Sequence, residues 1–212
     1  SEIVRTQFSR MTETYLQAVF DVCLRQVEAQ RGSRLLQRDR LGIFMAGGYA
    51  RRRPYDEDFD LIALIDTNDE EEQAIAEQAV AKLNRQIARR GVIAQYHLGG
   101  RLERFVLRVD ELDELLKDPE EDFLVDHSQL LGSRMVVGSR RVETALIDRM
   151  LVPHVFESDG AFEKRITTEI LDRRSRFKPM PEGMIHLKEE PGGLREIDLV
   201  LALAKARFKV YE

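Results

Sequence analysis

Several residue types are scarce in this chain of 212 residues, and each scarcity excludes a class of protein. There is no tryptophan and a single cysteine, Cys23, which rules out an internal disulfide framework and a cysteine-based zinc site. No apolar run approaches the roughly 18 residues that suggest a membrane span, and no secretory leader is recognisable. We therefore expect a cytoplasmic protein without membrane contact. Because Cys23 lies among apolar residues at helical spacing, we expect it to be a buried, inert thiol.

The excess of acidic over basic residues disfavours nucleic acid as a partner. With 33 basic and 38 acidic residues the net charge is −5, whereas general nucleic-acid binders are usually basic. The composition, 43% hydrophobic and 33% charged, is typical of a globular protein, and the length suits one large domain or two small ones. An apolar periodicity continues up to Glu212, so we expect a fragment of a longer chain.

Hydrophobic periodicity predicts an α+β fold with a small mixed sheet flanked by helices. The expected elements are a long helix with an apolar face from Val4, Phe8 and Met11 to Val27, strands over 41–46 and 58–65, a helix over 69–87, and strands over 92–98 and 104–109. From residue 110 onward the spacing is helical, with a turn at Pro191-Gly192-Gly193 before a last helix. We therefore expect a sheet-containing domain over 1–115 and a helical C-terminal half over 116–212.

Two acids, Asp58 and Asp60, lie two residues apart in the second predicted strand. Side chains alternate along a strand, so both carboxylates point to one face while Phe59 and Leu61 point to the core. Adjacent carboxylates repel each other unless a cation neutralises them. Hard divalent cations prefer carboxylate and phosphate oxygens, so the pair predicts a Mg²⁺ (or Mn²⁺) site that acts at phosphorus.

Gly47 and Gly48 end the preceding predicted strand, and Asp58 follows Gly48 by 10 residues. Without Cβ atoms, their backbone N–H groups can approach phosphate closely, and Arg51 can neutralise polyphosphate charge. Taken separately, the glycines could form a simple turn, the arginines a solvated surface and the acids a polar strand edge. The spacing and the apolar strands on both sides favour one phosphate-and-metal site.

The order of strand, Gly-Gly and Asp-x-Asp resembles the nucleotidyltransferase pattern of the DNA-polymerase-β-like superfamily. Within it, AGGYARRRPYDEDFDLIAL resembles the signature of bacterial PII uridylyltransferases through Gly47, Gly48, Tyr49, Arg51, Asp58, Asp60 and Leu61. LLGSRMVVGSRRV is similar to a second motif of that family through Leu130, Leu131, Arg134 and Gly138. HLKEEPGGLREIDLVLALAKARF is similar to a third, which the glutamine synthetase adenylyltransferases also carry in related form, through Lys188, Pro191, Gly192, Gly193, Leu194, Arg195 and Ile197.

The resemblance implies a nucleotidyltransferase core that transfers NMP from a nucleoside triphosphate to an acceptor hydroxyl. In that family the acceptor is a tyrosine on a small regulatory protein. The implied site residues are the catalytic metal ligands Asp58 and Asp60 and the nucleotide-binding residues Gly47, Gly48, Arg51, Lys188 and Arg195. The main alternative is a non-catalytic nucleotide-binding module within a larger signalling protein. An enzyme that acts on nucleic acid is disfavoured by the acidic balance.

Several positions depart from the family pattern. The departures are Ala50 in place of a glycine, Arg52 and Arg53 in place of a more neutral pair, Asp56 and Glu57 before the first aspartate, and Glu196 in place of an aspartate. They indicate a divergent member whose acceptor need not be the family's.

The third carboxylate of the superfamily is not evident. The strand predicted over 92–98 offers Gln95 and His97 on one face but no acid. Glu103 and Asp110 are the candidates, unless Asp110 caps the following helix. Elsewhere we interpret Asp126-His127 as a pair on a helix surface, and the arginines of DRRSRF as a solvated helix end.

Overall fold

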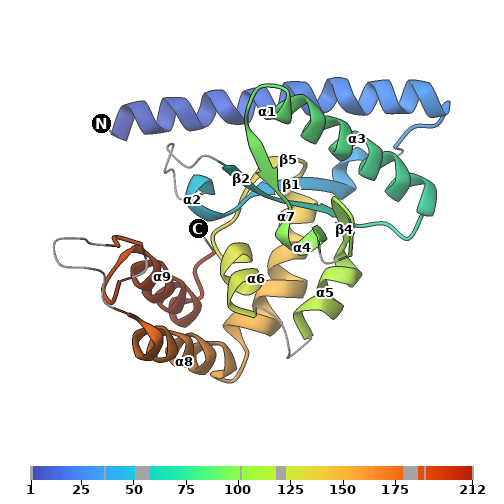
Figure 1. The fold of residues 1–212 in the computed structure, drawn as a ribbon. Helices are drawn as coiled ribbons and strands as arrows, with labels where there is room; N and C mark the ends of the chain where they lie inside the picture. Colours follow the sequence, from blue (N-terminus) through green and yellow to red (C-terminus); the bar gives the residue numbers. More distant parts are fainter. Residues whose placement is uncertain are drawn as a thin grey trace.

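The computed structural model describes residues 2–35, 37–50, 58–100, 102–117, 123–178, 186–188 and 190–211. The strands are β1 (Leu41–Met45), β2 (Asp58–Ile65), β3 (Ile93–Gln95), β4 (Val106–Arg108) and β5 (Arg134–Val137) (Figure 1). The helices are α1 (Glu2–Arg31), 3-10 helix η1 (Arg38–Arg40), α2 (Gly47–Ala50), α3 (Glu70–Ala88), α4 (His97–Gly100), α5 (Val109–Lys117), α6 (Phe123–Leu130), α7 (Arg140–Leu146), π-helix η2 (Ile147–Phe156), α8 (Ala161–Arg176) and α9 (Leu194–Phe208). Arg51, with positions 52–57, lies outside the described residues.

The strands form a mixed sheet, as the sequence predicts. Within the described residues the order is β3-β2-β1-β5, and β4 also pairs with β2. β1 is antiparallel to both β2 and β5. β2 is parallel to β3 along its first residues and to β4 along its last ones. β2 is therefore the central strand, and its two ends have different neighbours.

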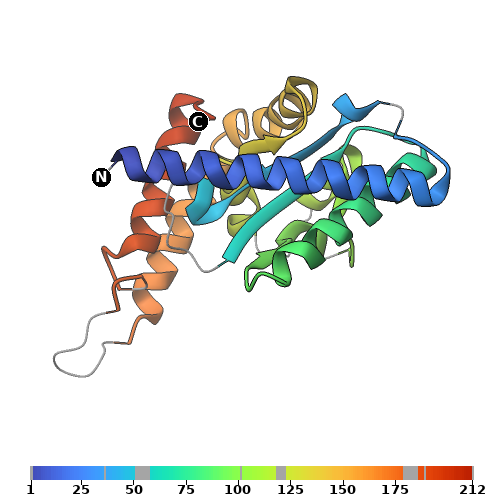
Figure 2. The same ribbon diagram turned by 90° about the horizontal axis from the view of Figure 1, so that it is seen from above.

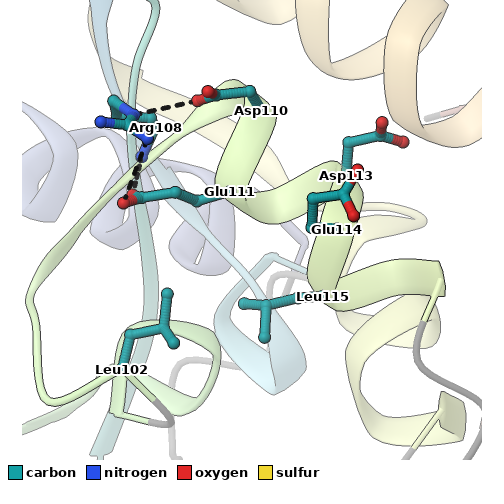
Figure 3. A pocket seen from close by; sticks show the side chains of 7 residues that line it. All are labelled: Leu102, Arg108, Asp110, Glu111, Asp113, Glu114 and Leu115. Atoms are coloured by element: carbon teal, nitrogen blue, oxygen red, sulfur yellow. Dashed lines mark hydrogen bonds and ion pairs between the residues drawn. The ribbon is translucent and has the colours of Figure 1, made fainter. Parts of the chain in front are cut away.

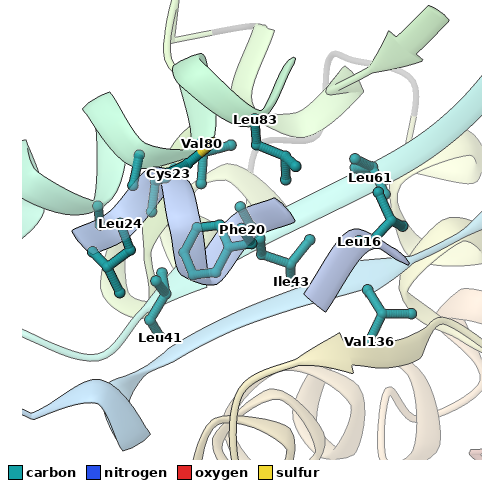
Figure 4. Close-up of a cluster of buried hydrophobic side chains, with 14 of the residues drawn as sticks. Leu16, Phe20, Cys23, Leu24, Leu41, Ile43, Leu61, Val80, Leu83 and Val136 are labelled. Atoms are coloured by element: carbon teal, nitrogen blue, oxygen red, sulfur yellow. The ribbon is translucent and has the colours of Figure 1, made fainter. Parts of the chain in front are cut away.

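Hydrophobic side chains cover both faces of the sheet. On one face, α1 and α3 lie side by side and pack on Ile43, Leu61 and Ala63 (Figures 2 and 4). On the other face, Phe44 and Leu64 belong to a second core that includes residues of α5 to α9. Residues of β2 alternate between these two cores, as the period of 2 predicts. Among the described residues, no helix combines the length and apolarity of a membrane span.

Two local predictions in the first half are confirmed. Cys23 is buried between α1 and α3, and this burial raises the pKa of its thiol above the ordinary value (Figure 4). α3 begins after Asp69, whose side chain accepts hydrogen bonds from the backbone N–H groups of Glu71 and Glu72. The acids in its first turn also suit the positive end of the helix dipole.

The half predicted as helical contributes a strand. β5 lies within residues 116–212, yet it pairs with β1 and completes the sheet. The short segment Arg134–Val137 has too few residues for its periodicity to be read, and its partner is distant in sequence. The core on this face combines Phe44 and Ile62 with Leu199 and Ala202 of α9, so it draws on both sides of the predicted boundary at residue 115.

The beginning of α1 differs from the predicted apolar face. Val4, Phe8 and Met11 are exposed, whereas Ser9 and Thr12 are buried. From Tyr15 and Leu16 onward the apolar face packs on α3 and the sheet. Helical periodicity gives the spacing of a face correctly, but burial depends on how far the rest of the fold extends along the helix.

The predicted strand over 92–98 is also shorter than expected. β3 ends at Gln95, and His97 begins the short helix α4. Tyr96 is buried and packs edge-to-face against Phe105, with ring centroids 5.0 Å apart. This aromatic contact fixes the point where the chain leaves the sheet.

Candidate active site

The acidic pair opens the central strand. Asp58 and Asp60 are the first and third residues of β2, and both are half-buried. Phe59, between the two acids, and Leu61, after the second, are buried in the core under α1 and α3. The two carboxylates therefore share the face on which Ile62 packs, the face covered by the C-terminal helices.

Gly47 lies directly against this pair. Its backbone has φ +59°, and a Cβ atom at this position would overlap Oδ2 of Asp60 and lie 3.0 Å from Asp60 Cγ. The N–H of Ala46 donates a hydrogen bond of 2.8 Å to the Asp60 carbonyl. The start of α2 and the start of β2 are thus in contact, and glycine at position 47 is what permits the carboxylate of Asp60 to lie there.

Gln95 reaches the pair from the other side. β2 and β3 run in parallel with Gln95 level with Asp60. The Gln95 amide Nε2 donates a hydrogen bond to Oδ2 of Asp58. From the sequence alone, Gln95 showed only that the strand predicted over 92–98 carries no acid on that face. Its contact with Asp58 depends on the pairing of β2 with β3, which sequence periodicity does not reveal.

Neither candidate for a third carboxylate lies in β4. Arg108 at the end of β4 is level with Ile65, at the opposite end of β2 from Asp58. Asp110 follows it in α5 and pairs with Arg108 Nε at 3.0 Å. Glu103 lies in an exposed turn with φ +54°.

Glu111, the residue after Asp110, caps the start of α5. The Glu111 carboxylate accepts the backbone N–H of Arg108 at 2.9 Å, in the manner of a capping box. A pocket lies at this end of the sheet and is lined by Leu102, Arg108, Asp110, Glu111, Asp113, Glu114 and Leu115 (Figure 3). Among the described residues, no group of three His, Cys, Asp or Glu side chains is arranged to hold a metal ion.

The Pro-Gly-Gly segment forms a compact turn at the start of α9. Lys188 is exposed, and its carbonyl accepts the backbone N–H of Arg195 at 3.0 Å. The carbonyl of Leu187 likewise accepts the N–H of Leu194 at 2.9 Å. The structure thus brings Lys188 and Arg195 together. They lie at one end of α9, a helix that packs against α8 and η2.

Glu196 fixes this turn to the neighbouring helix. Its carboxylate accepts hydrogen bonds from Arg174 Nε at 2.8 Å and Arg174 Nη2 at 2.9 Å, and from the backbone N–H of Gly192 at 2.9 Å. The Arg174 guanidinium, joined by the Gly192 N–H, lowers the pKa of Glu196 to about 2. Arg174 belongs to the predicted solvated helix end, and its role in joining α8 to α9 was not apparent from the sequence.

The interpretation of Asp126-His127 as a surface pair is wrong for His127, which is only 2% exposed. Its ring centroid lies 6.1 Å from that of His154, and His154 Nε2 is 2.8 Å from Oδ1 of Asp113. Because α6 packs against η2, His127 is enclosed between helices.

About half of the chain is similar in sequence to known proteins. No protein-family model matches it. Over 122 residues it is 30% identical to the bifunctional uridylyltransferase/uridylyl-removing enzyme of Burkholderia thailandensis. The same identity relates it to the enzymes of that name in Burkholderia mallei and Burkholderia pseudomallei. Part of this chain is distantly related to uridylyltransferases. The match covers 51% of the chain but only 14% of each relative, so the chain corresponds to a small part of those enzymes.

Proposed function

We propose that this chain transfers a nucleoside monophosphate from a nucleoside triphosphate to an acceptor hydroxyl. The observation that carries this proposal is the contact of Gly47 with Asp60, on a strand face that Asp60 shares with Asp58. Two glycines at the start of α2 and two carboxylates beside them suit a triphosphate with its counter-ion. The distant similarity to uridylyltransferases supports the same type of reaction.

The acidic pair fits a divalent cation. Asp58 and Asp60 offer hard oxygen donors on one strand face, and their mutual repulsion would be relieved by a positive ion. In our proposal these two residues hold Mg²⁺ (or Mn²⁺). When bound, such an ion neutralises phosphate charge and orients the phosphate oxygens.

The other predicted residues would hold the triphosphate. The backbone at Gly47 and Gly48, together with Arg51, would bind phosphate oxygens from the sheet side. Lys188 and Arg195, at the start of α9, would also bind the phosphate oxygens. The acceptor oxygen forms a bond to the α-phosphorus, the bond from that phosphorus to the β-phosphate oxygen breaks, and pyrophosphate leaves with the electron pair. The hydroxyl proton passes to solvent.

Pyrophosphate release from each of the four nucleoside triphosphates, with a small regulatory protein that carries an acceptor tyrosine and with and without Mg²⁺, tests the proposal. We expect Asp58→Asn and Asp60→Asn to abolish release, since each removes a charged ligand. Asp148→Asn is the matched control because Asp148 is exposed on η2, and its neighbour Arg149 pairs with Asp66, at the opposite end of β2 from the acidic pair. If Asp58→Asn releases pyrophosphate as fast as Asp148→Asn, the assignment is wrong. The acceptor in our proposal is a tyrosine on a small regulatory protein, as in the family that the sequence resembles.

One observation favours a second candidate, a module that binds nucleotide without transferring it. Gln95 stands level with Asp60, and the described residues supply no third acid beside the pair. Such a module would bind a triphosphate in a Mg²⁺-dependent way but would release no pyrophosphate, so the same experiment separates the two functions.

A further inference from the structure

Gln95 contacts the acidic pair through a neutral group. Its amide Nε2 donates to Oδ2 of Asp58, and both side chains are half-buried. An ionised carboxylate only accepts hydrogen bonds, so this contact requires an N–H donor at position 95. The hydrogen bond restricts the orientation of the Asp58 carboxylate without the help of a cation.

The neutrality of Gln95 sets the charge beside the pair. A glutamate at position 95 would add a third negative charge and would repel Asp58 unless a cation lay between them. With glutamine, the described residues of the site carry two negative charges, those of Asp58 and Asp60. The affinity of oxygen sites for hard cations depends on the number of charged ligands.

We propose that Gln95 is a positioning residue that orients Asp58 and keeps the metal site weak until a nucleoside triphosphate binds. The triphosphate then adds the phosphate oxygens and negative charge that Gln95 does not provide. The identity of the anion rests on the proposed function, whereas the orientation of Asp58 rests on the contact between Gln95 and Asp58.

Binding of Mn²⁺, followed by the loss of the free-ion EPR signal, tests this inference without requiring activity. We expect the wild-type protein to bind Mn²⁺ at least about tenfold more tightly with a non-hydrolysable triphosphate than without it. Gln95→Glu should tighten nucleotide-free binding by about tenfold or more, because it adds a charged ligand. Gln95→Leu should weaken binding in the presence of nucleotide by about 10- to 100-fold, as expected when a group that orients a metal ligand is lost.

Gln73→Glu is the matched control, since it adds the same charge on α3, which packs on the opposite face of the sheet. Circular dichroism shows whether each variant is folded. If Gln95→Leu does not fold, the comparison of Gln95→Glu with Gln73→Glu tests the inference. The inference is overturned if Gln95→Glu binds nucleotide-free Mn²⁺ no more tightly than Gln73→Glu, or if the wild type binds Mn²⁺ equally well without nucleotide. A wild-type protein that releases no pyrophosphate but shows the expected Mn²⁺ shifts would refute the transfer function and support the role of Gln95.

Discussion

Gly47 lies so close to Asp60 that a Cβ atom on residue 47 would overlap the carboxylate oxygen Oδ2 of Asp60. The positive φ of Gly47, +59°, is also a conformation that L side chains rarely adopt. The start of α2 and the start of β2 therefore depend on each other, and changing one should disturb the other.

Gly47→Ala tests this dependence. We expect a loss of about 1–2 kcal/mol in the free energy of unfolding from the left-handed backbone, and in addition the loss of nucleotide binding because Asp60 is displaced. Gly91→Ala is the matched control, because Gly91 has φ +78° and open space around its Cβ position. It should show the stability loss alone. Urea unfolding and triphosphate binding measure the two effects, and equal binding by both variants would contradict the role of Gly47.

The pairing of Glu196 with Arg174 should stabilise the helical half. Glu196→Gln keeps the size of the side chain but loses the charge that holds Arg174 and the Gly192 N–H. We expect the free energy of unfolding to fall by about 1–2 kcal/mol, the lower part of the range for hydrogen bonds to charged groups, because solvent screens the exposed Arg174 side chain. Glu157→Gln, which breaks the exposed pair with Lys209, should cost less than about 0.5 kcal/mol. Similar losses in the two variants would show that the Glu196 contacts add little.

The same contacts predict a pH dependence. The pKa of Glu196 is lowered from 4.5 to about 2 in the folded protein, so its contribution to stability is fully present above pH 4.5. The contribution should be lost as the pH falls from 4.5 towards 2, because the unfolded chain then binds the proton more readily. The stability difference between wild type and Glu196→Gln, measured by urea unfolding, should therefore be constant from pH 5 to 7 and should shrink below pH 4.5. A difference that grows on acidification would contradict this sign.

Cys23 should be unreactive in the folded protein. Its thiol is 2% exposed, and burial raises its pKa, so the thiolate that reacts with disulfide reagents is scarce. We expect a thiol reagent to label Cys23 only at the rate at which the protein unfolds, and immediately in denaturant. Rapid labelling of the native protein would show that α1 separates readily from α3.

The sequence predicted the acidic strand well because its signal is local. Asp58 and Asp60 alternate with Phe59 and Leu61, and a period of 2 is enough to assign their faces. The contact of Gln95 with Asp58 was not predictable, since it depends on which strand pairs with β2 and in which register. The pairing of β5 with β1 and of Arg174 with Glu196 likewise joins elements through tertiary packing, which a single sequence does not encode as a pattern.

The most direct test of nucleotidyl transfer is to identify which phosphate bond of the triphosphate breaks. Triphosphates labelled at the α- or the γ-phosphate, incubated with the protein and Mg²⁺, separate the possible reactions by their products. We predict that the γ-label appears in pyrophosphate and the α-label in a monophosphate, free or attached to an acceptor, with both products absent for Asp58→Asn and present for Asp148→Asn. Release of the γ-label as inorganic phosphate with a diphosphate as the other product, or equal yields from the two variants, would contradict transfer at Asp58 and Asp60.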